Sequence, residues 1–259
     1  MSALFVDTHC HFDFPPFSGD EADSLARAAA AGIEKIIVPA TVAARFPAVL
    51  ALAQRWQPLH AALGLHPVFI DHHQQDADIA TLEQIVRQRP ASLVAIGEIG
   101  LDLYIDTPQF ERQQALLEAQ LRLARDYDLP VILHSRRTHD KLAWHLRRFP
   151  LTRCGVIHGF AGSLSQAEAF VRLGYKIGVG GTISWPRASK TRQTIARLPL
   201  SALLLETDAP DMPLQGYQGQ PNRPERIADV WRVLCELRSE SPQHIAATIR
   251  ANTRELFAI

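Results

Sequence analysis

Short apolar runs alternate with amphipathic stretches along the whole chain. The apolar runs are typical of buried strands and occupy residues 4–11, 35–41, 59–66, 93–101, 130–135, 155–160, 175–181 and 202–207. Helical periodicity follows them at residues 21–31, 46–56, 79–89, 110–127, 138–149, 165–173, 189–197, 224–238 and 242–257. Gly32 and Pro90 come directly after two of these helical stretches, where helices commonly end. The pattern therefore predicts eight consecutive strand–helix units.

Eight such units in 259 residues favour one closed (β/α)8 TIM barrel, an α/β fold that usually takes about 250 residues. We therefore predict a single domain over residues 1–259. An open, doubly wound sheet is the alternative. No Gly-x-Gly-x-x-Gly sequence follows the first strand, however, so the dinucleotide-binding form of that fold would lack its phosphate loop. The longest irregular stretches, 101–109 and 209–223, follow strands and are expected at the active face.

Composition narrows the class of protein further. With 47% hydrophobic residues, 21% charged residues and a net charge of zero, the chain is an ordinary globular one without a standing attraction to DNA, RNA or acidic lipid. The three cysteines have no zinc-finger spacing and do not indicate a disulfide framework. No signal peptide or membrane-spanning run is present, so we expect a cytoplasmic protein without membrane association. Nothing in the sequence indicates an obligate protein partner.

Histidines and carboxylates recur where the predicted strands end. A single histidine at a strand end is more often hydrogen-bonded or solvent-facing than a metal ligand. In a barrel, however, the C-terminal ends of all strands meet at one face, so several such residues can act together. Six nitrogen or oxygen donors at one mouth exceed what one tetrahedral zinc needs and are enough for two metals bridged by a carboxylate. Seven histidines and carboxylates occupy such strand ends: His9, His11, His66, Glu98, His134, His158 and Asp208.

Glu98 is the acidic residue placed to bridge two metals from the middle of the barrel. A carboxylated lysine fills this role in some barrel hydrolases, but Lys35 and Lys176 lie at strand starts. Strand alternation places Asp7 on the face of His9, and Glu206 on the face of Asp208. We interpret both as partners that fix an imidazole tautomer; a structural salt bridge is the alternative for each.

Five sequence motifs recur at the predicted strand ends. They are His9-Cys10-His11, Gly97-Glu98-Ile99-Gly100-Leu101-Asp102, the 130–136 segment with His134-Ser135-Arg136, the 156–160 segment with His158-Gly159-Phe160, and Glu206-Thr207-Asp208-Ala209-Pro210. Taken together, these motifs resemble the TatD family of metal-dependent hydrolases, within the amidohydrolase superfamily. The resemblance implies a (β/α)8 barrel, a divalent-metal site and, in characterised relatives, hydrolysis of DNA phosphodiesters. The ligands that it implies are His9, His11, Glu98, His134, His158 and Asp208. This chain departs from relatives at Gly159, where Cys is common, and at 183–186, which replaces a segment that often ends in Lys.

Two divalent ions, with Zn, Mn and Mg all compatible with the donors, would generate hydroxide at neutral pH. Asp208 is the candidate to orient the water, accept its proton and protonate the leaving oxygen, while Glu98 holds the two ions together. His66 and Arg136 are candidate substrate contacts, Arg136 through a phosphate. The alternative for His66 is a histidine that lines the mouth of the barrel without contacting substrate. The alternative for Arg136 is a charged residue at the rim without a binding role.

Three classes of function follow from these residues. The first is a metal-dependent phosphodiesterase or deoxyribonuclease. The net charge of zero suits a small or single-stranded substrate better than a long duplex, which usually needs several phosphate contacts. The second is hydrolysis of a small amide, lactone or phosphoester, because the same hydroxide could attack those bonds. The third, metal binding without catalysis, is disfavoured because an open coordination position and a proton acceptor at Asp208 would serve no purpose in storage.

Overall fold

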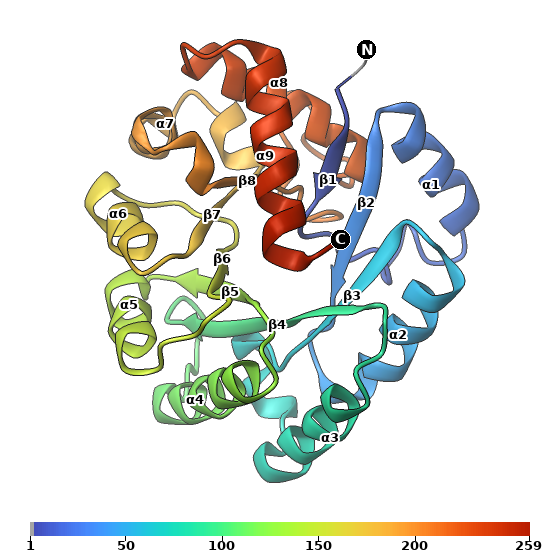
Figure 1. Ribbon diagram of the computed structural model, residues 1–259, viewed down its shortest axis with the longest axis vertical. Helices are drawn as coiled ribbons and strands as arrows, with labels where there is room; N and C mark the ends of the chain where they lie inside the picture. The colour runs from blue at the N-terminus through green and yellow to red at the C-terminus, as the bar shows by residue number, and fades with distance from the viewer. Residues whose placement is uncertain (1–2) are drawn as a thin grey trace.

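Eight parallel strands form a sheet around the axis of the molecule (Figure 1). The computed structural model describes residues 3–259. Its strands are β1 (Phe5–Asp7), β2 (Ile33–Pro39), β3 (Leu59–Leu63), β4 (Leu93–Asp102), β5 (Val131–Arg136), β6 (Gly155–Ile157), β7 (Lys176–Val179) and β8 (Leu203–Leu205). Each strand pairs in parallel with the next one along the chain. The predicted strand–helix alternation is therefore confirmed.

The sheet closes where the first strand meets the last. Thr8 N donates to Leu205 O at 3.1 Å, and Asp208 N donates to His9 O at 2.8 Å. A parallel bridge between Cys10 and Ala209 continues this pairing beyond the named strands. The (β/α)8 barrel is thus confirmed and the open sheet is excluded.

Helices cover the outside of the barrel, as the hydrophobic periodicity requires (Figure 1). They are α1 (Glu21–Ala30), α2 (Phe46–Arg55), α3 (Gln75–Gln88), α4 (Phe110–Asp126), α5 (His139–Arg148), α6 (Leu164–Arg172), α7 (Ser189–Arg197), α8 (Ile227–Leu237) and α9 (Pro242–Phe257). Short 3-10 turns are η1 (Ala43–Arg45), η2 (Pro67–His72), η3 (Gly181–Ser184), η4 (Leu200–Ala202) and η5 (Pro224–Arg226). Among residues 3–259, no helix combines the length and apolar character that crossing a membrane requires.

The apolar residues form two layers of core. The larger layer fills the space between the strands and the surrounding helices. The smaller layer fills the inside of the barrel, where Ile37, Ile132 and Leu204 meet Leu256 and Phe257 from the end of α9. Figure 1 shows α9 lying across one end of the barrel with the C-terminus near its centre. The last helix therefore closes the end of the barrel opposite to the C-terminal ends of the strands.

Two glutamine side chains on α4 fix the backbone near the ends of β3 and β4. Gln120 accepts a hydrogen bond from Leu65 N at 2.7 Å and donates to Leu65 O. Gln113 accepts from Asp102 N at 2.7 Å and donates to Asp102 O at 2.9 Å. Each carboxamide thus satisfies the backbone N–H and C=O groups of one buried residue. These bonds position Leu65, the neighbour of His66, and Asp102 at the end of β4.

Replacing Gln120 by Leu should lower the free energy of unfolding by roughly 1–3 kcal/mol, because it leaves the buried Leu65 N–H without an acceptor. Urea unfolding followed by circular dichroism measures this difference. Gln84→Leu, at an exposed position of α3, is the matched control and should change the midpoint little. Equal midpoints for the two variants would show that the Gln120 carboxamide does not stabilise the fold.

Candidate metal centre

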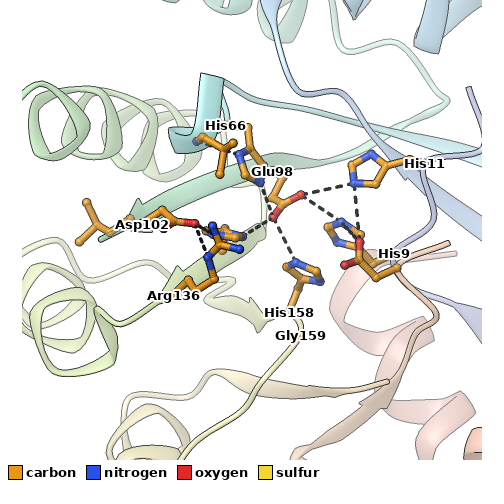
Figure 2. A network of polar contacts seen from close by, with 12 residues as sticks. His9, His11, His66, Glu98, Asp102, Arg136, His158 and Gly159 are labelled. Atoms are coloured by element: carbon orange, nitrogen blue, oxygen red, sulfur yellow. Dashed lines mark hydrogen bonds and ion pairs between the residues drawn. The ribbon is translucent and has the colours of Figure 1, made fainter. Parts of the chain in front are cut away.

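All seven candidate residues lie at the C-terminal side of the barrel. Glu98 and His134 lie within β4 and β5, and His158 directly follows β6. His9 and His11 follow β1, His66 follows β3 and Asp208 follows β8. Figure 2 shows Glu98 at the centre of this group, with His9 and His11 to one side and Asp102 and Arg136 to the other. The structure therefore brings the predicted residues together around one carboxylate.

A bulge in β4 directs Glu98 into the barrel. Ile96 pairs with Val131 and Ile99 with Leu133, so three steps along β4 match two steps along β5. The extra residue falls at Gly97–Glu98 and changes the direction in which the strand presents its side chains. A Cβ atom on Gly97 would lie 2.6 Å from Ile132 Cβ, so only glycine fits this close approach of the two strands. The Glu98 carboxylate is buried as a result.

One oxygen of Glu98 faces the donors that come from the first and last strands. Glu98 Oε2 lies 3.0 Å from His9 Nε2 and 3.7 Å from His11 Nε2. Asp208 Oδ1 lies 3.6 Å and 3.7 Å from the same two nitrogens. His9, His11 and Asp208 therefore offer three donor atoms on this side of the carboxylate.

The other oxygen faces three imidazoles from the middle strands. Glu98 Oε1 lies 2.9 Å from His66 Nε2, 3.0 Å from His134 Nδ1 and 3.1 Å from His158 Nε2. His66 Nδ1 accepts a hydrogen bond from Val68 N at 3.1 Å, so the neutral ring carries its proton on Nε2 and donates it to Glu98. His66 is therefore a donor to the bridging carboxylate rather than a metal ligand.

His134 and His158 have the opposite arrangement. His134 Nε2 lies 2.7 Å from Asp102 Oδ2, which holds the proton on Nε2 and leaves a lone pair on Nδ1. His158 Nδ1 lies 3.6 Å from Glu206 Oε1, which likewise favours a lone pair on Nε2. Both lone pairs point toward the Glu98 carboxylate, the direction that a shared cation would require.

The cluster fits divalent metal by distance and by its unpaired atoms. Two ligands about 2.0–2.2 Å from one metal lie about 3.0–3.6 Å from each other, which resembles the separations around Glu98. Among residues 3–259, both ring nitrogens of the buried His9 lack a hydrogen-bond partner, and His9 Nε2 faces Glu98 Oε2. Buried polar atoms are normally paired, so His9 Nε2 suits a cation better than a hydrogen bond.

Burial and neighbouring charges shift the pKa values of the cluster in different directions. Burial lowers the pKa values of His134 and His158, but the carboxylates beside them, Asp102 and Glu98 for His134 and Glu98 for His158, outweigh it and raise both. Burial would raise the pKa of Glu98, but His66, His158 and His9 outweigh it and keep that pKa well below its ordinary value. Burial lowers the pKa of His66 to about 4, so this ring is neutral at pH 7. Burial raises the pKa of Asp208 to about 6, although His158 and His11 act in the opposite direction. Glu98 is thus a permanent anion, and Asp208 can gain or lose a proton near neutral pH.

Asp102 is the residue of this site that sequence reasoning missed. Its buried carboxylate contacts His134 Nε2, accepts from Tyr104 N at 2.6 Å and lies 2.9 Å from Arg136 Nε. It therefore orients a candidate ligand and anchors a guanidinium. Strand alternation could have found it, because Asp102 lies four residues after Glu98 and ends the same motif.

The expectation that Asp7 fixes the tautomer of His9 is wrong. Asp7 Oδ1 accepts from the backbone N–H groups of His9 and Thr207, at 3.2 Å and 3.0 Å, and Asp7 Oδ2 accepts from Thr207 Oγ1. The reason is that Asp7 lies at the seam between β1 and β8, where its carboxylate is used by the backbone of His9 and by Thr207. Asp7 therefore supports barrel closure and positions the backbone of His9. Glu206 lies beside His158, and it also accepts from Gly159 N.

A cavity of about 460 Å³ opens above Glu98. Its lining includes His11, His66, His134, His158 and Asp208, together with the apolar side chains of Phe14, Val68 and Phe69. Arg136 is absent from this lining; it lies at the rim, with its side chain 47% exposed. The cavity thus offers a hydrophobic wall opposite a polar centre, which is typical of small-molecule sites.

The family model for TatD-related DNases matches residues 6–258, which is nearly the whole chain. The chain belongs to the TatD family. This assignment confirms the resemblance carried by the five sequence motifs.

Three relatives of this TatD protein show the range of similarity. The uncharacterized metal-dependent hydrolase YjjV of Escherichia coli (strain K12) is 66% identical over 259 residues, covering 100% of both chains. The crystal structure of the TatD homolog YJJV from Escherichia coli K12 superposes with a TM-score of 0.98 and covers 100% of both chains. The 3'-5' ssDNA/RNA exonuclease TatD of Citrobacter koseri is 30% identical and covers 94% of this chain and 95% of its own. The protein is therefore a metal-dependent hydrolase of the TatD family.

Glu98→Gln in this TatD protein should lower the amount of divalent metal that copurifies with the chain, because the neutral amide no longer offsets the charge of bound cations. Elemental analysis after gel filtration measures metal per chain. Glu111→Gln, at an exposed position of α4, is the control for loss of one carboxylate. Full metal content in Glu98→Gln would remove Glu98 from the metal site.

Proposed function

We propose that this protein is a phosphodiesterase that uses two divalent metal ions and acts on single-stranded DNA or another small nucleic-acid substrate. One observation carries the proposal: each oxygen of the buried Glu98 carboxylate faces its own set of nitrogen donors. A carboxylate that joins two such sets is the arrangement that bridges two cations. We assign no metal, since mixed histidine and carboxylate donors accept Zn, Mn or Mg.

His9, His11 and Asp208 would hold one ion with Glu98 Oε2. His134 and His158 would hold the other with Glu98 Oε1, because both present a lone pair in that direction. When bound, the ions lower the pKa of coordinated water toward neutrality and polarise the phosphoryl oxygen under attack. Glu98 balances their charge, and Asp102 and Glu206 keep the two rings in the required tautomer.

Asp208 is the proposed proton acceptor. Its side chain is 23% exposed at the mouth, whereas the Glu98 side chain is almost completely buried. The raised pKa of Asp208, about 6, matches a group that accepts a proton at neutral pH and returns it to the leaving oxygen. His66 lies against Glu98 and lines the cavity, from where its ring can contact substrate.

Several features support a single strand or strand end as the substrate. Phe14 and Phe69 line the cavity, and aromatic rings stack on unpaired bases. Arg136 holds its guanidinium beside the centre through Asp102, where it can bind a phosphate. The net charge of zero favours few phosphate contacts over the many that a long duplex demands. The name of the Citrobacter koseri relative, a ssDNA/RNA exonuclease, agrees with this class of substrate.

The test is hydrolysis by purified protein loaded separately with Zn, Mn and Mg. Single-stranded DNA, single-stranded RNA and duplex DNA are compared with a panel of small lactones, amides and phosphoesters. We expect release of nucleotides from single strands at a higher kcat/KM than from duplex. Hydrolysis confined to the small lactones, amides or phosphomonoesters would overturn the proposal in favour of a metabolite hydrolase.

Asp208→Asn should reduce turnover by roughly 10²–10⁴ while metal content falls little, since the amide oxygen can still ligate but cannot accept a proton. The wild-type rate should rise with pH as Asp208 loses its proton. That limb should lie at or below about pH 6, because bound cations lower the pKa further. The variant should lose the limb in a pH profile of kcat. If Asp208→Asn instead loses metal and keeps its rate per bound ion, Asp208 is a ligand only.

A further inference from the structure

An exposed tyrosine and two arginines gather at the rim of the metal centre. Tyr104 lies in the loop after β4, and its side chain is 55% exposed. Arg136 Cζ lies 4.5 Å and Arg137 Cζ 4.3 Å from the centre of the Tyr104 ring. Such separations are typical of cation–π contacts. We call Tyr104, Arg136 and Arg137 the rim cluster.

The positive charge of the rim cluster is largely unpaired. Within residues 3–259, Arg137 makes no ion pair, and Arg136 has one, through Nε to Asp102. The two terminal nitrogens of Arg136 therefore remain available as a fork for a planar or tetrahedral anion. Arg137 also has a left-handed backbone with φ of 60°, which is uncommon for a residue with a side chain. The surrounding structure thus holds a second guanidinium over the ring at an energetic cost.

The rim cluster is joined to the metal centre by a single carboxylate. Asp102 Oδ2 lies 2.7 Å from His134 Nε2 and 2.9 Å from Arg136 Nε. Asp102 Oδ1 also accepts from Tyr104 N, so the loop that bears the tyrosine is fixed by the same side chain. Figure 2 shows Asp102 and Arg136 next to each other beside the Glu98 cluster. These contacts fix the position of the rim cluster relative to His134 and the candidate metal centre.

We propose that the rim cluster is a subsite for the nucleotide that adjoins the bond being cleaved. Tyr104 stacks on its base, and Arg136 and Arg137 bind its phosphates. A base can stack on any aromatic face, and guanidinium forks match phosphate oxygens, so the subsite selects single-stranded polynucleotide without reading its sequence. The inference rests on the proposed phosphodiesterase activity and adds the residues that make a polymer a better substrate than an isolated diester.

A second pair of the same chemistry provides a matched control. Arg148 Cζ lies 4.4 Å from the Trp144 ring, and the Trp144 side chain is 45% exposed. This pair belongs to α5 and lies toward its C-terminal end, away from the strand ends that bear the metal centre. Trp144→Ala and Arg148→Ala thus remove an exposed arginine–aromatic contact that does not adjoin the site.

Binding is measured by fluorescence anisotropy with a short fluorescein-labelled oligodeoxythymidylate. The protein is the metal-loaded full chain in the Asp208→Asn background, which prevents cleavage. Tyr104→Ala should weaken binding by roughly 5- to 100-fold, the range that corresponds to one lost base stack, whereas Tyr104→Phe should restore it. Arg137→Ala should flatten the dependence of log Kd on log salt by about 0.7, the value for one phosphate contact on a single strand. Trp144→Ala and Arg148→Ala should match the parent.

Cleavage assays separate this proposal from the proposed function. With Asp208 intact, Tyr104→Ala and Arg137→Ala should lose more kcat/KM on the oligonucleotide than on bis(p-nitrophenyl) phosphate. Equal losses on both substrates, or oligonucleotide binding equal to that of the parent, would overturn the subsite and leave the phosphodiesterase in place. If the wild type hydrolyses no diester but the rim variants still weaken binding, the proposed activity fails, and the rim cluster remains a binding site for single strands without a role in cleavage.

Discussion

The position of one buried carboxylate governs the rest of the catalytic face. A carboxylate inside a protein is expensive unless positive charge or hydrogen-bond donors surround it. Glu98 meets this demand with five imidazoles, two of them on one oxygen and three on the other. Those imidazoles come from the ends of β3, β5 and β6 and from the segment after β1, so they converge only when the barrel is closed. The candidate metal centre therefore forms only in the closed barrel, where all five imidazoles reach Glu98.

Precision at this site comes from groups that never touch the metal. Asp7 holds the backbone of His9 and Thr207 across the seam of the barrel. Gln113 holds the peptide of Asp102, which in turn orients His134. Ligand positions thus rest on hydrogen bonds to backbone groups, which are less free to move than side chains. Supporting contacts of this kind commonly decide how well a metal site binds and reacts.

The sequence predicted the barrel and the gathering of the seven residues well, because both follow from periodicity and from parallel strands ending at one face. The sequence did not predict the bulge in β4, the start of α3 or the role of Asp7. The bulge at Gly97–Glu98 is a mismatch between two strands, and the run of apolar residues in β4 gives no sign of it. Helix α3 begins at Gln75 rather than at 79, because Asp76 and Asp78 stabilise its first turn without apolar periodicity. The assignment of Asp7 failed because its contacts to Thr207 span 200 positions, across the barrel seam.

The closure of the barrel by α9 also affects the order in which parts of the polypeptide can fold during synthesis. Leu256 and Phe257 fill the interior of the barrel, yet they follow all eight strands along the chain. Until they emerge, Ile37, Ile132 and Leu204 lack their covering layer, and the nascent barrel exposes an apolar opening. Folding units usually form during synthesis as their sequence appears, and exposed apolar surface at that stage invites aggregation. Translation must therefore pass all eight strands and α9 before the interior is sealed.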